Sequence, residues 1–109
     1  MPGGHPSDAD REEAALPVLT AALRAARDRD ALALREAYSD DAVWLAPEGT
    51  LRGGDTAAAA HLAVAGGAEA WDEPQQQGAK AVLRWTAAAG RGAVVVEVRR
   101  GRIIFAATA

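Results

Sequence analysis

Two segments near the C-terminus alternate apolar and polar residues with a period of two, and no other feature constrains the fold as much. In residues 79–87, one face consists of Ala81, Leu83 and Trp85. In residues 93–99, one face consists of Val94, Val96 and Val98. Because successive side chains of a strand point to opposite faces, each segment predicts a β-strand that covers a core. Residues 103–108, apolar on both faces, predict a third strand.

The preceding part of the chain favours helices. Residues 8–26 carry apolar residues at helical spacing, although Pro17 either kinks this helix or begins a second segment. A short helix follows Asp30, and a third helix follows Asp55 and ends at 66–67. Each of these aspartates is predicted to cap its helix.

Shorter strands complete the pattern. Residues 43–46 and 50–52 predict a hairpin, after residues 39–41 stop the second helix. Residues 68–76 predict an edge strand that bends near Pro74. The order predicts an α+β domain over residues 8–109, with residues 1–7 as a disordered tail. In this architecture three N-terminal helices cover the concave face of a cone-shaped, strongly curved antiparallel sheet.

Composition excludes several kinds of site. A chain of 109 residues is long enough for one domain with one core. The absence of cysteine excludes disulfides, thiolate catalysis and zinc–thiolate sites. A net charge of −3 argues against nucleic acid as a partner. With no apolar run of about 18 residues and no secretory signal pattern, we expect no membrane partner and a cytoplasmic location. Asp40 and Asp41 lack a nearby histidine, and we expect neither metal nor organic cofactor.

A curved sheet closed by helices leaves a cavity on its concave side. The apolar positions expected to face it are Trp44, Ala46, Leu83, Trp85, Val94 and Val96. These side chains predict a slot for an apolar ligand, unless they simply pack together as a filled core. On the opposite face, Val82, Val95 and one side of 103–107 form an apolar centre ringed by charged side chains, which favours a homodimer through the outer sheet face. The ring consists of Lys80, Arg84, Glu97 and Arg99.

Residues 29–31, 38–44 and 49–55, together with the hairpin at 94–103, resemble a known family. They are similar to the signature stretches of nuclear-transport-factor-2-like domains of the SnoaL-like and ketosteroid-isomerase-like type. The resemblance implies the cone-shaped fold and a superfamily that includes isomerases, polyketide cyclases, epoxide hydrolases and non-catalytic binders. The three catalytic positions of the isomerase branch correspond to Ala46, Ala22 and Val94, which have no ionisable group. Steroid isomerisation is therefore not expected.

His61 takes the place of a pocket tyrosine in that resemblance. It lies on an otherwise apolar helix, and its ordinary pKa of about 6.5 suits proton transfer near neutral pH. The alternative is a core histidine that is bonded to a backbone carbonyl. Alternation on the strand of Trp71 places either Glu69, Trp71 and Glu73 or Asp72 inward, unless this strand is an exposed edge. The sequence does not decide which carboxylate reaches the pocket.

These observations predict a small-molecule enzyme of the isomerase, cyclase or lyase type. Its substrate would be hydrophobic, polyketide-like and carbonyl-bearing, and His61 would be the catalytic acid or base. The expected substrate-binding residues are Trp44, Trp71, Trp85, Leu83, Val94, Val96 and Gln76. A non-catalytic ligand-binding or dimerisation module of the same fold is the alternative.

Overall fold

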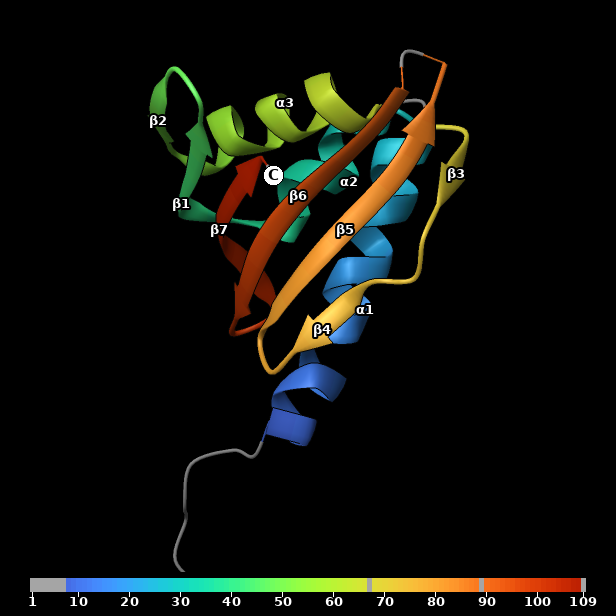
Figure 1. Ribbon diagram of the computed structural model, residues 1–109. Coiled ribbons are helices and arrows are strands. Elements are labelled where there is room, and N and C mark those ends of the chain that lie inside the picture. The colour runs from blue at the N-terminus through green and yellow to red at the C-terminus, as the bar shows by residue number, and fades with distance from the viewer. Residues whose placement is uncertain (1–7, 67, 89, 109) are drawn as a thin grey trace, which may run out of the picture.

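The structure is a computed structural model that describes residues 8–66, 68–88 and 90–108 (Figure 1). The predicted tail at residues 1–7, which includes His5, lies outside the described residues. The helices are α1 (Asp8–Arg27), α2 (Ala31–Ala37) and α3 (Gly54–Ala65). The strands are β1 (Tyr38–Ala46), β2 (Gly49–Arg52), β3 (Ala70–Trp71), β4 (Gln75–Gln77), β5 (Lys80–Ala87), β6 (Gly90–Arg99) and β7 (Arg102–Thr108).

The described strands form one curved sheet, and the helices lie together on its concave face, as Figure 1 shows. The order is β2-β1-β7-β6-β5-β3, and β4 also pairs with β5. All pairs are antiparallel except β1 with β7, which run parallel. The α+β class and the curved sheet with three helices agree with the sequence prediction, while the parallel pair differs from the expected all-antiparallel sheet.

The boundaries of several elements differ from those expected. Pro17 lies inside α1, which continues through it as one helix of 20 residues. β1 begins at Tyr38, and the residues expected to stop the helix, 39–41, lie within this strand. The N-cap of α3 is Gly53, which has no side chain to cap the helix, and not Asp55, which lies in the first turn and pairs with Arg35. Residues 68–76, expected as one strand, contain β3 and the beginning of β4.

The alternation that predicts the long strands is confirmed by burial. On β5 the buried residues are Ala81, Leu83 and Trp85, and on β6 they are Val94, Val96 and Val98. Val96 lies opposite Ala81 and also opposite Ala106 of β7, so the inner face continues across three strands. This face packs against α1, α2 and α3 in one hydrophobic core. The largest side chains that the core buries fully are Trp44, Tyr38, Leu19, Leu34, Leu83, Ile103, His61, Val94 and Val96.

Candidate functional site

The structure places His61 in the interior and joins it to a residue that lies 23 positions earlier. The Tyr38 hydroxyl oxygen is 2.8 Å from Nδ1 of His61, and both side chains are 0% exposed. Tyr38 is the C-cap of α2, where the backbone becomes extended, and it is also the first residue of β1. This change of conformation directs its ring into the core, towards α3.

Trp44 completes an aromatic cluster around the imidazole. Its ring centroid lies 5.9 Å from that of His61 with the planes tilted by 41°, and Trp44 is 2% exposed. Tyr38 meets the imidazole edge-on, with centroids 5.8 Å apart. The inward side of α3 otherwise consists of small residues, Ala57, Ala58 and Ala65, so His61 is the bulkiest side chain that this helix buries. The helix is therefore held to β1 largely by His61 and its two aromatic neighbours.

One ring nitrogen of His61 lacks a partner. Nε2 is buried and makes no hydrogen bond among the described residues, although Nδ1 is bonded to Tyr38. If the Tyr38 hydroxyl donates, Nε2 carries a proton that is not shared. If Nδ1 donates, Nε2 is a lone-pair acceptor without a donor. An unpaired buried polar atom costs about 1–3 kcal/mol, so a polar group that reached Nε2 would be bound favourably.

Burial also changes the acid–base properties of this pair. Loss of hydration lowers the pKa of His61 from 6.5 to about 4, because the apolar interior disfavours the imidazolium. The same cause raises the pKa of the Tyr38 phenol above its ordinary value. Both groups are therefore neutral at pH 7. The unperturbed histidine pKa on which the sequence argument relied does not hold in this environment.

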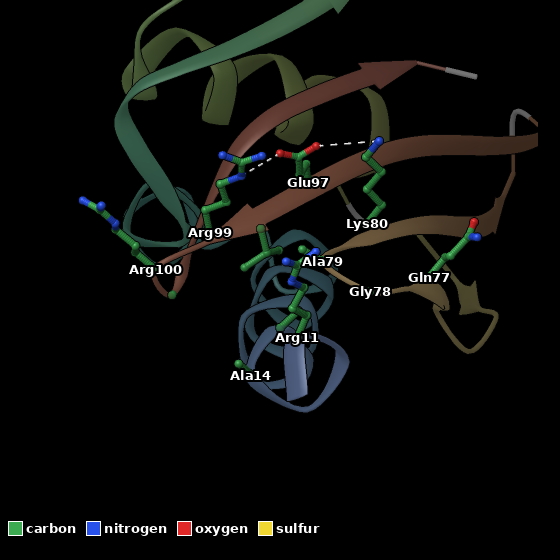
Figure 2. Close-up of a pocket in the computed structure, with 12 residues that line it drawn as sticks. Arg11, Ala14, Gln77, Gly78, Ala79, Lys80, Glu97, Arg99 and Arg100 are labelled. Atoms are coloured by element: carbon green, nitrogen blue, oxygen red, sulfur yellow. Dashed lines mark ion pairs between the residues drawn. The ribbon is translucent and has the colours of Figure 1, made fainter. Parts of the chain in front are cut away.

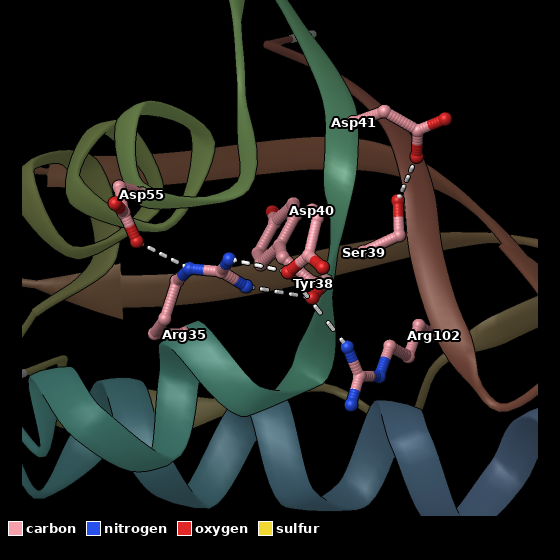
Figure 3. A network of polar contacts seen from close by, with 7 residues as sticks. All are labelled: Arg35, Tyr38, Ser39, Asp40, Asp41, Asp55 and Arg102. Atoms are coloured by element: carbon pink, nitrogen blue, oxygen red, sulfur yellow. Dashed lines mark hydrogen bonds and ion pairs between the residues drawn. The ribbon is translucent and has the colours of Figure 1, made fainter.

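A second polar cluster holds the elements that carry the pair (Figure 3). Arg35 of α2 donates to the backbone oxygen of Tyr38 at 3.0 Å, to Asp40 Oδ1 at 2.7 Å and to the Asp55 carboxylate at the start of α3. The pKa of the Asp40 carboxyl is lowered by the Arg35 guanidinium. Arg35 thus joins α2, β1 and α3 at one point.

Gly54 allows α3 to begin close to this cluster. A Cβ at Gly54 would lie 2.5 Å from the backbone oxygen of Ser39 and 2.6 Å from the Arg35 guanidinium. Only a residue without a side chain permits this approach, because real Cβ contacts at such distances do not occur. Gly54 therefore lets the start of α3 pack closely against β1 and Arg35.

The tryptophans predicted to line one slot fall into two groups. Trp71 lies opposite Trp85 across β3 and β5, with ring centroids 6.0 Å apart, whereas Trp44 is beside His61. β7 and β6 lie between β1 and β5, which separates the two groups by about 14 Å along the sheet, at about 4.8 Å for each strand. The indole nitrogen of Trp71 is also buried without a partner among the described residues.

The other predicted lining residues lie on the inner face. Leu83, Val94 and Val96 are at most 1% exposed and belong to the core, whereas Ala46 is half-buried. Gln76 is half-buried and lies opposite Ala81, which places it on the same face. Ala22, Ala46 and Val94 correspond to the three catalytic positions of the isomerase branch, and none of them has a polar side chain.

Among the described side chains, no carboxylate accompanies His61 in the interior. Glu69, Asp72 and Glu73 are all exposed, so neither alternation considered for this segment brings an acid inside. The segment is held by the backbone instead, since the Glu69 and Asp72 amides donate to Thr86 and Arg84 of β5. Among the described residues, no group of three or more potential metal ligands is found, and no helix is long and apolar enough to cross a membrane.

Two cavities of the described residues lie away from His61. The larger, about 890 Å³, lies between the start of α1 and the turns that precede β5 and β7 (Figure 2). The smaller, about 160 Å³, is lined by Asp72, Arg84, Trp85, Thr86, Arg91 and Gly92. Neither is lined by His61, Tyr38 or Trp44. The expected apolar slot is therefore not one of these cavities, and the side chains expected to line it pack in the core or at its margin.

Sequence reasoning did not identify Tyr38 and Arg35 as parts of this site. Because residues 39–41 were expected to stop the second helix, Tyr38 was expected to be its last residue, and nothing linked it to a residue on α3. The sequence did contain a signal for a strand that begins earlier, because tyrosine and β-branched residues such as Val43 favour strands. Arg35 carried no sequence signal, since its three partners meet only when α2, β1 and α3 are packed together.

Comparison with known proteins assigns the fold. No protein-family model matches the sequence, and no curated protein is detectably similar to it. Among solved structures, the chain is similar to an NTF2-like protein of unknown function from Mesorhizobium loti, at 24% identity over 95% of this chain and 94% of that one, with a TM-score of 0.74.

Two further similar structures have names that state an activity. An LEH-like epoxide hydrolase from M. tuberculosis is 24% identical over 88% of this chain and 81% of its own, with a TM-score of 0.66. A protein assigned as a polyketide cyclase from Sinorhizobium meliloti is 19% identical over 85% of this chain and 94% of its own, with a TM-score of 0.69. The topology and these similarities together show that the chain has the NTF2-like fold, as the sequence resemblance implied.

Proposed function

We propose that this chain is a small-molecule enzyme of the isomerase or cyclase type that binds a hydrophobic, carbonyl-bearing substrate against His61. The observation that carries the proposal is the fully buried imidazole whose Nε2 has no partner among the described residues. A carbonyl or hydroxyl oxygen placed there would satisfy this nitrogen while the aromatic neighbours contact the apolar body of the ligand. An epoxide hydrolase and an assigned polyketide cyclase among the similar folds support this reaction class.

The chemistry follows from the neutral state of the pair. With a pKa of about 4, His61 is a weak base at pH 7, so a neutral Nε2–H donor suits it better than a proton acceptor. The Tyr38 hydroxyl, donating to Nδ1, holds the proton on Nε2. In this role, as solvent water takes a proton from the carbon next to the substrate carbonyl, His61 polarises the carbonyl and stabilises the negative charge that develops on its oxygen. One such donor is typically worth about 10²–10³ in kcat.

Substrate entry requires movement, because the interior around His61 is packed. Helix α3 is the element best suited to move, by a tilt that keeps the hydrogen bond between Tyr38 and His61. Its buried surface against the sheet is mostly alanine, which loses less hydrophobic contact on separation than leucine or valine would. Trp44 and Tyr38 would then form the walls of the opened site. The tryptophan pair on β3 and β5, with Gln76, would contact the far end of a long substrate.

Proton exchange next to a carbonyl tests the proposal. A flat aromatic β-diketone, benzoylacetone, is incubated in deuterated buffer, and deuterium incorporation is followed by NMR. We expect the protein to accelerate exchange and His61→Ala to abolish it while binding stays within about tenfold. Leu62→Ala, on the next position of α3, serves as the matched control and should retain exchange. Full activity of His61→Ala would remove His61 from the mechanism, and binding without exchange would point to the second candidate.

That second candidate is a non-catalytic ligand-binding or dimerisation module. It is favoured by the absence of any buried carboxylate among the described side chains and by the low pKa of His61. Without a base near neutral pH, the interior can hold a ligand by one hydrogen bond and apolar contact but has no group to move a proton.

The outer face of the sheet supports assembly into a homodimer under either candidate. One row across four strands is apolar and consists of Val82, Val95, Ala107 and Leu45. The adjacent row pairs Lys80 with Glu97, and then continues through Phe105 to Val43. Leu45 is 44% exposed and Phe105 36% exposed in the single chain. A second copy related by a twofold axis would cover this surface and place the charges at its rim.

Light scattering of the full chain tests the dimer. We expect about twice the 11.2 kDa mass at micromolar concentration, and the monomer mass for Phe105→Glu. Leu32→Glu, which changes an exposed leucine on α2, is the matched control and should stay dimeric. A monomeric wild type would exclude this interface.

A further inference from the structure

A cavity that is separate from His61 lies at one end of the molecule. Its walls come from three places in the sequence: the beginning of α1, the turn between β4 and β5, and the turn between β6 and β7, all visible in Figure 2. The lining residues are Arg11, Ala14, Ala15, Gln77, Gly78, Ala79, Lys80, Glu97, Val98, Arg99, Arg100 and Gly101. At about 890 Å³ it has the size of a small-molecule site.

The charge of this lining is opposite to that of the whole chain. Four cationic side chains and one carboxylate line the cavity, whereas the chain has a net charge of −3. The carboxylate of Glu97 lies 3.0 Å from Arg99 Nε and 4.0 Å from Lys80 Nζ, so it is already shared between two cations. Arg100, beside them, is exposed and adopts a positive φ of 52°. An anion that entered here would meet an excess of positive charge.

The floor of the cavity is apolar and formed by small residues. Ala15 and Val98 are 2% and 5% exposed and belong to the hydrophobic core. Ala79 is half-buried, and Gly78 and Gly101 have no side chain, so the backbone of both turns borders the space. This combination fits a ligand with a compact apolar body and one acidic group.

We propose that this cavity binds a small organic anion at the end of the sheet, with a carboxylate or phosphate held by Arg99, Arg100 and Lys80 on the outer side and an apolar body that passes between the two turns towards Ala15 and Val98 on the inner side. Arginine suits both acidic groups, because its planar guanidinium can donate two parallel hydrogen bonds to either. The site is independent of His61 and of the reaction proposed there.

Calorimetric titration of the full chain with three probes of equal length tests the proposal. Octanoate and octyl phosphate represent the two acidic groups, and octanol lacks the charge. We expect both anions to bind at least about tenfold more tightly than octanol at low salt, and the difference to shrink as salt screens the cations. The ratio of the two anions identifies the preferred acidic group. Octanol binding as tightly as octanoate, or no binding of either anion at about 10 mM, would overturn the proposal.

Variants of equal net charge locate the binding. The double variant Arg99→Gln/Arg100→Gln should weaken both anions by about tenfold or more. Arg24→Gln/Arg52→Gln removes two exposed arginines outside the cavity and should change the affinity less than twofold, by about the error of the measurement. Equal weakening in both variants would show a general charge effect and contradict a site.

Amide chemical shifts separate this site from the one at His61. On addition of octanoate, the largest changes are expected at Gly78 and Gly101, in the wild type and in His61→Leu alike. Changes centred on Tyr38 and α3 that disappear in His61→Leu would place the anion in the interior and refute a separate site. Loss of the exchange activity proposed for His61 would leave this result unaffected.

Discussion

The hydroxyl of Tyr38, at the first position of β1, lies 2.8 Å from Nδ1 of His61 on α3, and both side chains are fully buried. This hydrogen bond determines which ring nitrogen remains for another partner. It also makes a histidine the polar centre of an otherwise apolar core, with consequences for stability that can be measured apart from any reaction.

The first prediction concerns pH. The folded pKa of His61, about 4, is below the unfolded value of about 6.5, so the unfolded chain binds a proton in this range and the folded chain does not. The contribution of His61 to the free energy of unfolding is therefore complete above about pH 6.5, and it is lost as the pH decreases towards 4. Between pH 7 and pH 5 the loss from His61 should be about 2 kcal/mol, measured by urea denaturation. His61→Leu should lack this component, and an identical pH dependence in both proteins would contradict the burial of a neutral imidazole.

A second prediction concerns the hydroxyl of Tyr38. Tyr38→Phe keeps the ring but leaves Nδ1 as well as Nε2 of His61 without a partner, so it should destabilise the fold by about 1–3 kcal/mol. Chemical denaturation of the two single variants and the double variant Tyr38→Phe/His61→Leu gives the coupling energy. We expect the double variant to be less destabilised than the sum of the singles. Strict additivity would mean that the hydrogen bond contributes nothing.

A third prediction concerns the Arg35 cluster. Arg35→Met retains an unbranched apolar stem but removes the guanidinium that lowers the pKa of Asp40. Carboxyl titration by NMR should show the pKa of Asp40 rising towards its ordinary value. Arg102→Met serves as a comparison, because Arg102 Nη1 is 4.0 Å from Asp40 Oδ1 and its influence is the smaller one. A larger rise in the Arg102 variant would reverse this order of causes.

A fourth prediction concerns Gly92, which lies opposite Trp85 on the neighbouring strand. A Cβ at this position would overlap the indole ring, so Gly92→Ala must displace Trp85. Overpacking of this kind costs about 1–3 kcal/mol, and the change should appear in denaturation followed by tryptophan fluorescence. Trp85→Leu in the same chain should relieve most of the added cost. A stable single variant with unchanged fluorescence would contradict the packing described.

Much of the fold followed from local patterns. The alternation in β5 and β6 predicted both strands and which side chains they bury, because a strand with one buried face must place apolar residues at every second position. Apolar residues at helical spacing predicted α1, and the flanking Asp55 and residues 66–67 predicted α3. Local patterns could not predict that β1 begins at Tyr38, since the polar residues 39–41 look like a turn, and only the pairing of Tyr38 and Val43 with β7 on either side of them shows the strand.

The sequence by itself determined an α+β chain with one apolar sheet face, no thiol chemistry and a single histidine in the described interior. The tertiary structure alone decided what that histidine meets, because Tyr38 and Arg35 reach their partners only when α2, β1 and α3 pack together. It also decided that His61, Tyr38 and Trp44 are buried together and that a cavity of about 890 Å³ forms elsewhere, at the turns that precede β5 and β7. Periodicity reports which face of an element is buried, whereas contact between elements depends on how they pack in three dimensions.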